Sequence, residues 1–209
     1  MTQEFAEHLI VRPTLHHFGI ATGNLEAMVD WYGKVVGMVI VHQSARPWES
    51  KPDAYLGSAF VSNDTAHHRI AINALPGLKD DTDRYHAKFQ HVAFEYQTID
   101  DLLNTYTRLK GLLIEPVLST DHGPSIAFYY ADPDGNNVEL FVDTFGDRIK
   151  SFEYLRTSPD FHKNPMGTLV DPQKLVEARK AGMTFAELNQ RAYAGEFAPA
   201  TTPDPRVLL

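Results

Sequence analysis

Two histidines and one glutamate are the residues of this 209-residue chain whose types and positions point most directly to chemistry. His17 and His91 each stand near the start of a short apolar run, and Glu139 stands between Val138 and Leu140 in another. Burying a lone carboxylate in an apolar strand is costly, and a bound metal ion would neutralise its charge. Two neutral imidazoles and one carboxylate, with other positions open, are the ligand set of non-haem iron(II) oxygenases. The three residues therefore predict a metal centre.

The composition excludes several other kinds of site. The chain has no cysteine, which excludes disulfide scaffolds, thiolate zinc sites, iron–sulfur clusters and cysteine nucleophiles. Its formal net charge of −8 argues against nucleic acid or an anionic membrane as the main partner. No run of about 20 apolar residues and no secretory signal is visible. We therefore expect a cytoplasmic protein that binds no membrane and no nucleic acid.

An internal repeat relates the two histidines. Residues 15–40 align with residues 89–114 at an offset of 74 and without a gap. Each copy predicts a buried strand, then a helix with an N-cap residue, an apolar stripe and a terminal glycine. The aligned pairs are His17 with His91, Asn24 with Thr98, Tyr32 with Tyr106, and Gly37 with Gly111. A histidine, a cap and a helix end in one register indicate a duplicated unit.

Three strands are predicted after each helix, so that each unit is β-α-β-β-β. They fall at 38–43, 55–62 and 67–74 in the first copy, and at 114–119, 125–131 and 136–143 in the second. The sequence thus predicts an α+β fold in which paired modules, about 14–75 and 87–146, form a curved mixed sheet around a metal cavity. The polar segment 76–86 would link the copies.

The tail, residues 147–209, has a different character from the paired-module domain, residues 1–146. Asp171, Pro172 and Gly182 predict a helix over 171–182, and a Thr184/Glu187 capping box predicts another over 184–195. Two short helices cannot bury their own apolar faces. We therefore expect the tail to pack on the core or on a neighbouring subunit.

Structural roles compete with this interpretation of the three residues. A single histidine in a strand is more often a hydrogen-bonded structural residue than a metal ligand, and a strand glutamate near a turn usually faces solvent. The matched position of His17 and His91 favours function. Glu139 must point to the face opposite Val138 and Leu140, because side chains alternate along a strand.

Three segments carry a resemblance to a known family. HHFGIATGNLEAMVDWY (16–32), QHVAFEY (90–96) and FYYADPDGNNVELF (128–141) resemble the vicinal oxygen chelate superfamily. Within it they are most similar to the small, one-domain type I extradiol catechol dioxygenases, which act on catechols such as 2,3-dihydroxybiphenyl. The resemblance covers roughly residues 14–146. It implies that His17, His91 and Glu139 bind iron(II), with manganese(II) as the alternative ion, and the repeat register selects His17 over His16.

The resemblance also implies acid–base residues around the metal. His68, in a His-x-Ile-Ala stretch, matches the family's histidine near the oxygen site better than His67 does. Tyr129 lies ten residues before Glu139 and four before the turn proline, where the family has its active-site tyrosine, and Tyr130 fits neither count. His122 is the candidate for a third family histidine, although its spacing to the tyrosine is shorter than in the large enzymes.

The implied reaction is the insertion of both atoms of O₂ into a catechol, and two other activities compete with it. A lyase or isomerase of the same superfamily would use zinc, nickel or manganese, and two histidines with a glutamate are also a zinc set. A small-molecule-binding resistance protein would often lack the ligands. No acid occurs within 67–72, where the first copy would match Glu139, so three ligands favour the dioxygenase. Exposed strand edges and the tail suggest a homo-oligomer.

Overall fold

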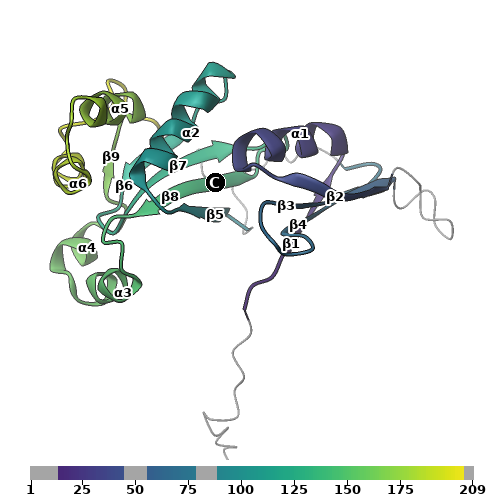
Figure 1. Cartoon of the computed structure of the whole chain (residues 1–209), viewed down its shortest axis with the longest axis horizontal. Helices are drawn as coiled ribbons and strands as arrows, with labels where there is room; N and C mark the ends of the chain where they lie inside the picture. Colours follow the sequence, from purple (N-terminus) through teal and green to yellow (C-terminus); the bar gives the residue numbers. More distant parts are fainter. Residues whose placement is uncertain (1–13, 45–55, 79–88, 205–209) are drawn as a thin grey trace, which may run out of the picture. The chain divides into compact units, whose positions relative to one another are not determined.

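The two halves of the repeat fold as separate units of one design. The computed structural model describes residues 14–44, 56–78 and 89–204. Unit 1 holds β1 to β4 and most of α1, and unit 2 holds the remaining strands and helices (Figure 1). Each unit is described by itself below.

Unit 1 is a four-stranded sheet with one helix. Its elements are β1 (Phe18–Thr22), α1 (Leu25–Val36), β2 (Val39–Ser44), β3 (Gly57–Ser62) and β4 (Ile70–Ala74). The strand order is β1-β4-β3-β2, with β1 parallel to β4. Asn24 caps α1 by accepting a hydrogen bond from the Ala27 N–H, and Gly37 ends the helix with φ of 71°. This left-handed conformation explains the predicted terminal glycine.

Unit 2 repeats this order and extends it by one strand. Its first elements are β5 (His91–Tyr96), α2 (Ile99–Gly111), β6 (Leu118–Asp121), β7 (Ser125–Ala131) and β8 (Asn137–Asp143). The order is β5-β8-β7-β6 followed at the edge by β9 (Thr168–Leu169), with β5 parallel to β8. The shared topology confirms the predicted α+β fold built from βαβββ modules. α2 lies across one face of the sheet, where Tyr106 meets Phe128 at 5.9 Å between ring centroids (Figure 1).

Three predicted boundaries were wrong for local reasons. The strand predicted at 114–119 begins only at Leu118, because Pro116 cannot donate a ladder hydrogen bond and Leu113 takes the left-handed conformation with φ of 62°. Gly111 does not stop the second helix, which includes it and is capped by Leu112. The strand predicted at 67–74 begins at Ile70, so that His68 precedes the strand.

The tail folds against unit 2. It contains α3 (Arg148–Thr157), α4 (Pro159–Lys163), β9 (Thr168–Leu169), α5 (Pro172–Lys180) and α6 (Phe185–Tyr193). The two predicted helices correspond to α5 and α6, and both sides of the Thr184/Glu187 capping box are present. α3, α4 and β9 were not predicted. β9 pairs with β6 and thereby adds an edge strand to the sheet. Residues 1–13, 205–209, position 55 and most of the expected linker lie outside the described residues.

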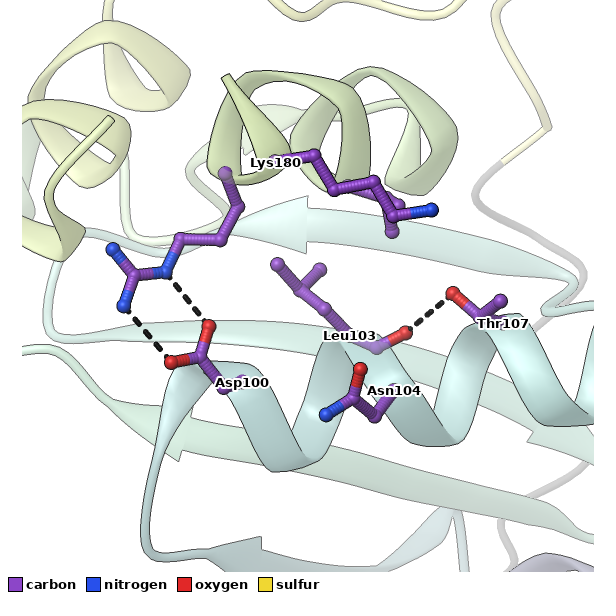
Figure 2. A pocket seen from close by; sticks show the side chains of 7 residues that line it. Asp100, Leu103, Asn104, Thr107 and Lys180 are labelled. Carbon is purple, nitrogen blue, oxygen red and sulfur yellow. Dashed lines mark hydrogen bonds and ion pairs between the residues drawn. The ribbon is translucent and has the colours of Figure 1, made fainter. Parts of the chain in front are cut away.

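α5 packs on α2 within unit 2. Arg179 donates from Nε and Nη2 to the Asp100 carboxylate, at 2.7 and 2.9 Å. Figure 2 shows the α2 side chains Asp100, Leu103, Asn104 and Thr107 beside the helix that carries Lys180, and together they line a pocket of about 370 Å³. None of the helices in the described part of the chain is long and apolar enough to cross a membrane.

Candidate metal centre

One face of the unit 2 sheet gathers the predicted polar residues. Glu139 on β8 is in register with Ala93 on β5 and with Tyr129 on β7. Side chains at paired positions point to the same face of a sheet. Val138 and Leu140 point the other way, toward α2, and both are fully buried. The alternation predicted for Glu139 is therefore confirmed, and its face is the one that α2 leaves free.

His91 and Glu139 form a close pair on this face. The Nε2 atom of His91 lies 3.0 Å from Oε2 of Glu139, whose side chain is almost fully buried. Burial raises the pKa of Glu139, while the adjacent His91 and the Tyr129 hydroxyl oppose that rise. When a histidine nitrogen and a carboxylate oxygen bind the same divalent ion, each at about 2.1 Å and at a right angle to one another, the two atoms lie about 3 Å apart. The pair therefore suits a metal ion, which would also neutralise the buried carboxylate.

Gln90 orients the His91 ring, and it was not predicted as a functional residue. Its side-chain oxygen is hydrogen-bonded to Nδ1 of His91. An amide oxygen can only accept, so Nδ1 of His91 donates to Gln90, and Nε2 is the nitrogen that faces Glu139. Metal-binding histidines commonly donate from their second nitrogen in this way. The sequence signal that could have identified Gln90 is its position directly before the candidate ligand His91.

Tyr129 and His122 extend the site along the same face. The Tyr129 hydroxyl lies 3.1 Å from Nε2 of His122, and it also hydrogen-bonds to Glu139. Burial, followed by the charge of Glu139, raises the pKa of Tyr129, so the side chain stays a proton-bearing hydroxyl. Burial lowers the pKa of His122, which favours the neutral imidazole. We call His91, His122, Tyr129 and Glu139 the carboxylate cluster.

Unit 1 brings the other predicted histidines together. The rings of His17 and His68 are 4.2 Å apart between centroids, and Nδ1 of His68 lies 2.6 Å from Nδ1 of His67. His68 is buried and stacks on Phe60 at 4.9 Å. Burial lowers the pKa of His68, and the neighbouring histidines lower it further, His17 first. The structure thus places His68 beside His17. We call His16, His17, His67 and His68 the histidine cluster.

Arg69 holds the segment that carries His17. Its guanidinium donates to the main-chain oxygen of His16 at 2.8 Å and forks onto the Asp64 carboxylate. That fork is a bidentate contact, which fixes the guanidinium in one orientation. The Phe18 N–H also donates to the Arg69 carbonyl, at 3.2 Å. Arg69 is therefore a structural support that the sequence analysis did not identify.

The three predicted ligands are distributed between the two units. His17 belongs to unit 1, and His91 and Glu139 belong to unit 2. Within the residues that the structure describes, no three histidine, aspartate or glutamate side chains are grouped to hold one ion. The position that matches Glu139 in unit 1 is Ala71, because Gly19 pairs with Ala71 as Ala93 pairs with Glu139. As predicted, this position carries no acid.

Comparisons with known proteins agree with this architecture. Residues 14–140 match the Glyoxalase/Bleomycin resistance protein/Dioxygenase superfamily. Two proteins of Rhodococcus globerulus match nearly throughout. Biphenyl-2,3-diol 1,2-dioxygenase 2 is 32% identical over 94% of this chain and 97% of its own length. Biphenyl-2,3-diol 1,2-dioxygenase 3 is 34% identical over 89% of this chain and 92% of its own length.

More distant matches cover about two thirds of the chain. A lactoylglutathione lyase of Neisseria meningitidis is 26% identical over 66% of this chain and 97% of its own length. A solved glyoxylase/bleomycin resistance protein/dioxygenase domain from Frankia has a TM-score of 0.53 at 15% identity, over 64% of this chain and 93% of that one, which shows the fold alone. By its family match and its two near full-length relatives, the chain belongs to the Glyoxalase/Bleomycin resistance protein/Dioxygenase superfamily.

Proposed function

We propose that this protein is an extradiol ring-cleaving dioxygenase, which inserts both atoms of O₂ into a catechol-type diol such as 2,3-dihydroxybiphenyl. The observation that carries the proposal is the contact of His91 with the buried Glu139 carboxylate, flanked on the same face by Tyr129 and His122. The two dioxygenases of Rhodococcus globerulus that match most of this chain support the same reaction.

The metal would be held by His91 and Glu139 together with His17. His17 is included because it aligns with His91 in the repeat: His17 directly precedes β1, and His91 is the first residue of β5. Iron(II) is the proposed ion. When bound, it supplies open positions for both catechol oxygens and O₂, lowers the pKa of the catechol hydroxyls and passes electrons from the ring to oxygen.

The remaining polar residues would move protons. His122 is neutral by burial, so its imidazole can accept a proton from a catechol hydroxyl. Tyr129 keeps its own proton and can donate it from the hydroxyl oxygen. His68 lies beside His17 and is also held neutral, so that it can deliver or remove a proton near that ligand.

A lyase of the same superfamily is the competing activity. Ala71 at the position that matches Glu139 leaves unit 1 without a carboxylate ligand there. A three-residue ligand set keeps more positions open, and a diol together with O₂ needs them. The lyase of Neisseria meningitidis also matches a smaller share of this chain than either dioxygenase does. Both observations favour the dioxygenase.

The test is oxygen uptake with a panel of catechols. Protein purified and loaded with iron(II) under anaerobic conditions is mixed in air with monocyclic and biphenyl-type catechols, including 2,3-dihydroxybiphenyl. We expect oxygen consumption and a yellow ring-opened product. Glu139→Gln should lose both iron and activity, whereas Glu177→Gln, on the exposed surface of α5, should keep both. A silent panel, or a preparation that is active only with zinc or nickel, would refute the proposal.

Two further predictions concern the setting of the enzyme. We propose that it works in the cytoplasm and forms a homo-oligomer, as its strand edges and tail suggest. Size-exclusion chromatography with light scattering would measure the mass of the assembly. A monomer at micromolar concentration would contradict the second prediction.

A further inference from the structure

We propose that Asn189 of α6 is a positioning residue, which keeps His122 in contact with Tyr129 by fixing the β6–β7 turn (residues 121–125) on both sides of His122. The catalytic consequence rests on the proposed function, in which His122 accepts a proton. The contacts themselves do not depend on that function, and they all lie within unit 2.

The Asn189 side chain bridges the two chain neighbours of His122. Its Nδ2 donates to the Asp121 carboxylate at 2.9 Å and to the main-chain oxygen of Gly123 at 3.4 Å. A side-chain amide nitrogen carries two hydrogens, so it can make both bonds at once. One side chain of the tail therefore ties the residue before His122 to the residue after it.

The carboxylate of Asp121 makes this link necessary for the shape of the turn. It is completely inaccessible to solvent, and its other oxygen accepts from the Gly123 N–H at 2.7 Å. The His122 N–H donates to the Ser125 carbonyl at 2.9 Å and closes the turn. A buried oxygen that loses its donor must find another partner or water. Without Asn189, the turn would therefore have to rearrange around Asp121.

Close packing holds α6 and the rest of the tail at this turn. A Cβ atom at Gly123, which has φ of 95°, would lie 3.0 Å from the Tyr154 hydroxyl and 3.3 Å from the Tyr193 ring. A Cβ at Gly167 would lie 2.6 Å from Cα of His122. The tail thus touches the backbone of the turn directly, and Asn189 reaches it from a fixed position.

The position of the turn determines the contact between His122 and Tyr129. Nε2 of His122 lies 3.1 Å from the Tyr129 hydroxyl. Tyr129 itself is held within the sheet, opposite Leu118 on one side and Glu139 on the other. A hydrogen bond of this length is lost when its atoms separate by a further ~1 Å. A small shift of the turn would therefore remove His122 from Tyr129 while Tyr129 stays in place.

A double-mutant cycle separates this positioning role from a merely structural one. In iron-loaded enzyme, Asn189→Leu should lower kcat by about tenfold or more, and by no more than His122→Gln, because an acid–base group contributes about 10²–10⁴-fold. In the His122→Gln background, Asn189→Leu should change kcat by less than about twofold, since the two residues act through one contact. Equal losses in both backgrounds, or no loss in either, would overturn the proposal.

The matched control is Gln190→Leu, the same kind of exchange at the next position of α6. Gln190 is exposed, so this variant should keep both kcat and KM. Asn189→Leu should act on kcat and leave the KM of the catechol within about twofold, because His122 moves a proton and is not proposed to bind the substrate. A loss of kcat in Gln190→Leu as large as that in Asn189→Leu would assign the effect to α6 as a whole and would overturn the proposal.

A second measurement does not depend on activity. Proton NMR of diamagnetic zinc-loaded protein reports the nuclear Overhauser effect (NOE) between the rings of His122 and Tyr129, whose signals are identified by their loss in His122→Gln and Tyr129→Phe. This NOE should be present in the unaltered protein and in Gln190→Leu, and should weaken by about half or more in Asn189→Leu.

The NMR result distinguishes the two proposals. An NOE of equal strength in Asn189→Leu, or none in the unaltered protein, would overturn the role of Asn189. If Asn189→Leu fails to fold, Asn189→Ser replaces it, because the shorter side chain cannot reach both partners. A silent catechol panel together with the expected NOE changes would refute the proposed function alone.

Discussion

The buried Asp121 should make the stability of this protein depend on pH. Asp121 is completely inaccessible to solvent, and burial raises its pKa from 3.8 to about 7. Below about pH 3 the carboxyl is protonated in both the folded and the unfolded chain, so its burial does not lower the stability. As the pH rises toward 7, the unfolded chain releases the proton while the folded chain retains it. The free energy of unfolding therefore falls by about 1.4 kcal/mol per pH unit in this range.

The substitution Asp121→Asn should remove this dependence. The amide oxygen can accept from the Gly123 N–H, and the Asn189 amide can turn to accept from the new NH₂ group, so the shape and the hydrogen bonds are kept. Between pH 5 and 7, the stability of the variant relative to the natural protein should rise by about 2 kcal/mol, because the folded carboxyl itself begins to ionise near pH 7. The exposed Asp134 supplies the control, Asp134→Asn.

Urea unfolding followed by circular dichroism at pH 5, 6, 7 and 8 measures this difference. Metal-free protein is used throughout, so that metal binding does not contribute its own pH dependence. Subtracting the two unfolding free energies at each pH cancels all other titrating groups. A difference that stays constant across this range would show that the folded chain holds Asp121 ionised, and the reasoning from burial would be wrong.

Three further substitutions test the site and the tail. His68→Phe should lower turnover by about 10²–10⁴-fold with iron content unchanged, because it removes an acid–base group and keeps a ring on Phe60; near-full oxygen uptake would contradict that role. Leu175→Ala should lower the free energy of unfolding by about 2–5 kcal/mol, because this α5 side chain is fully buried. Urea unfolding measures the loss, and a loss of only about 0–1 kcal/mol would mean that the surrounding structure collapses around the smaller residue. Arg179→Met should lower the free energy of unfolding by less than about 1 kcal/mol in the same assay, because Arg179 and Asp100 are both solvent-accessible despite their short contact. A larger loss would show that this ion pair stabilises the packing of α5 on α2 more than an exposed ion pair does.

Local sequence signals accounted for most elements of the duplicated part. Caps and helix ends depend on a few neighbouring residues, so Asn24, Gly37 and the Thr184/Glu187 box could be recognised without the fold. α3 was missed because its apolar residues form no clear stripe, and β9 because two residues carry no periodic pattern. The start of β6 differs from the predicted one because Pro116 lies inside the apolar run and cannot donate a ladder hydrogen bond.

The sequence by itself determined the duplication, the module topology and the candidate residues, because residue types and their spacing are local properties of the chain. Only the tertiary structure decided which side chains meet. The parallel register of β5 and β8 brings His91 to Glu139, and β7 adds Tyr129 to the same face. The tail reaches His122 because Gly167 lacks a Cβ atom. That approach joins segments more than forty residues apart, and it depends on strand pairing and close packing that no sequence period records.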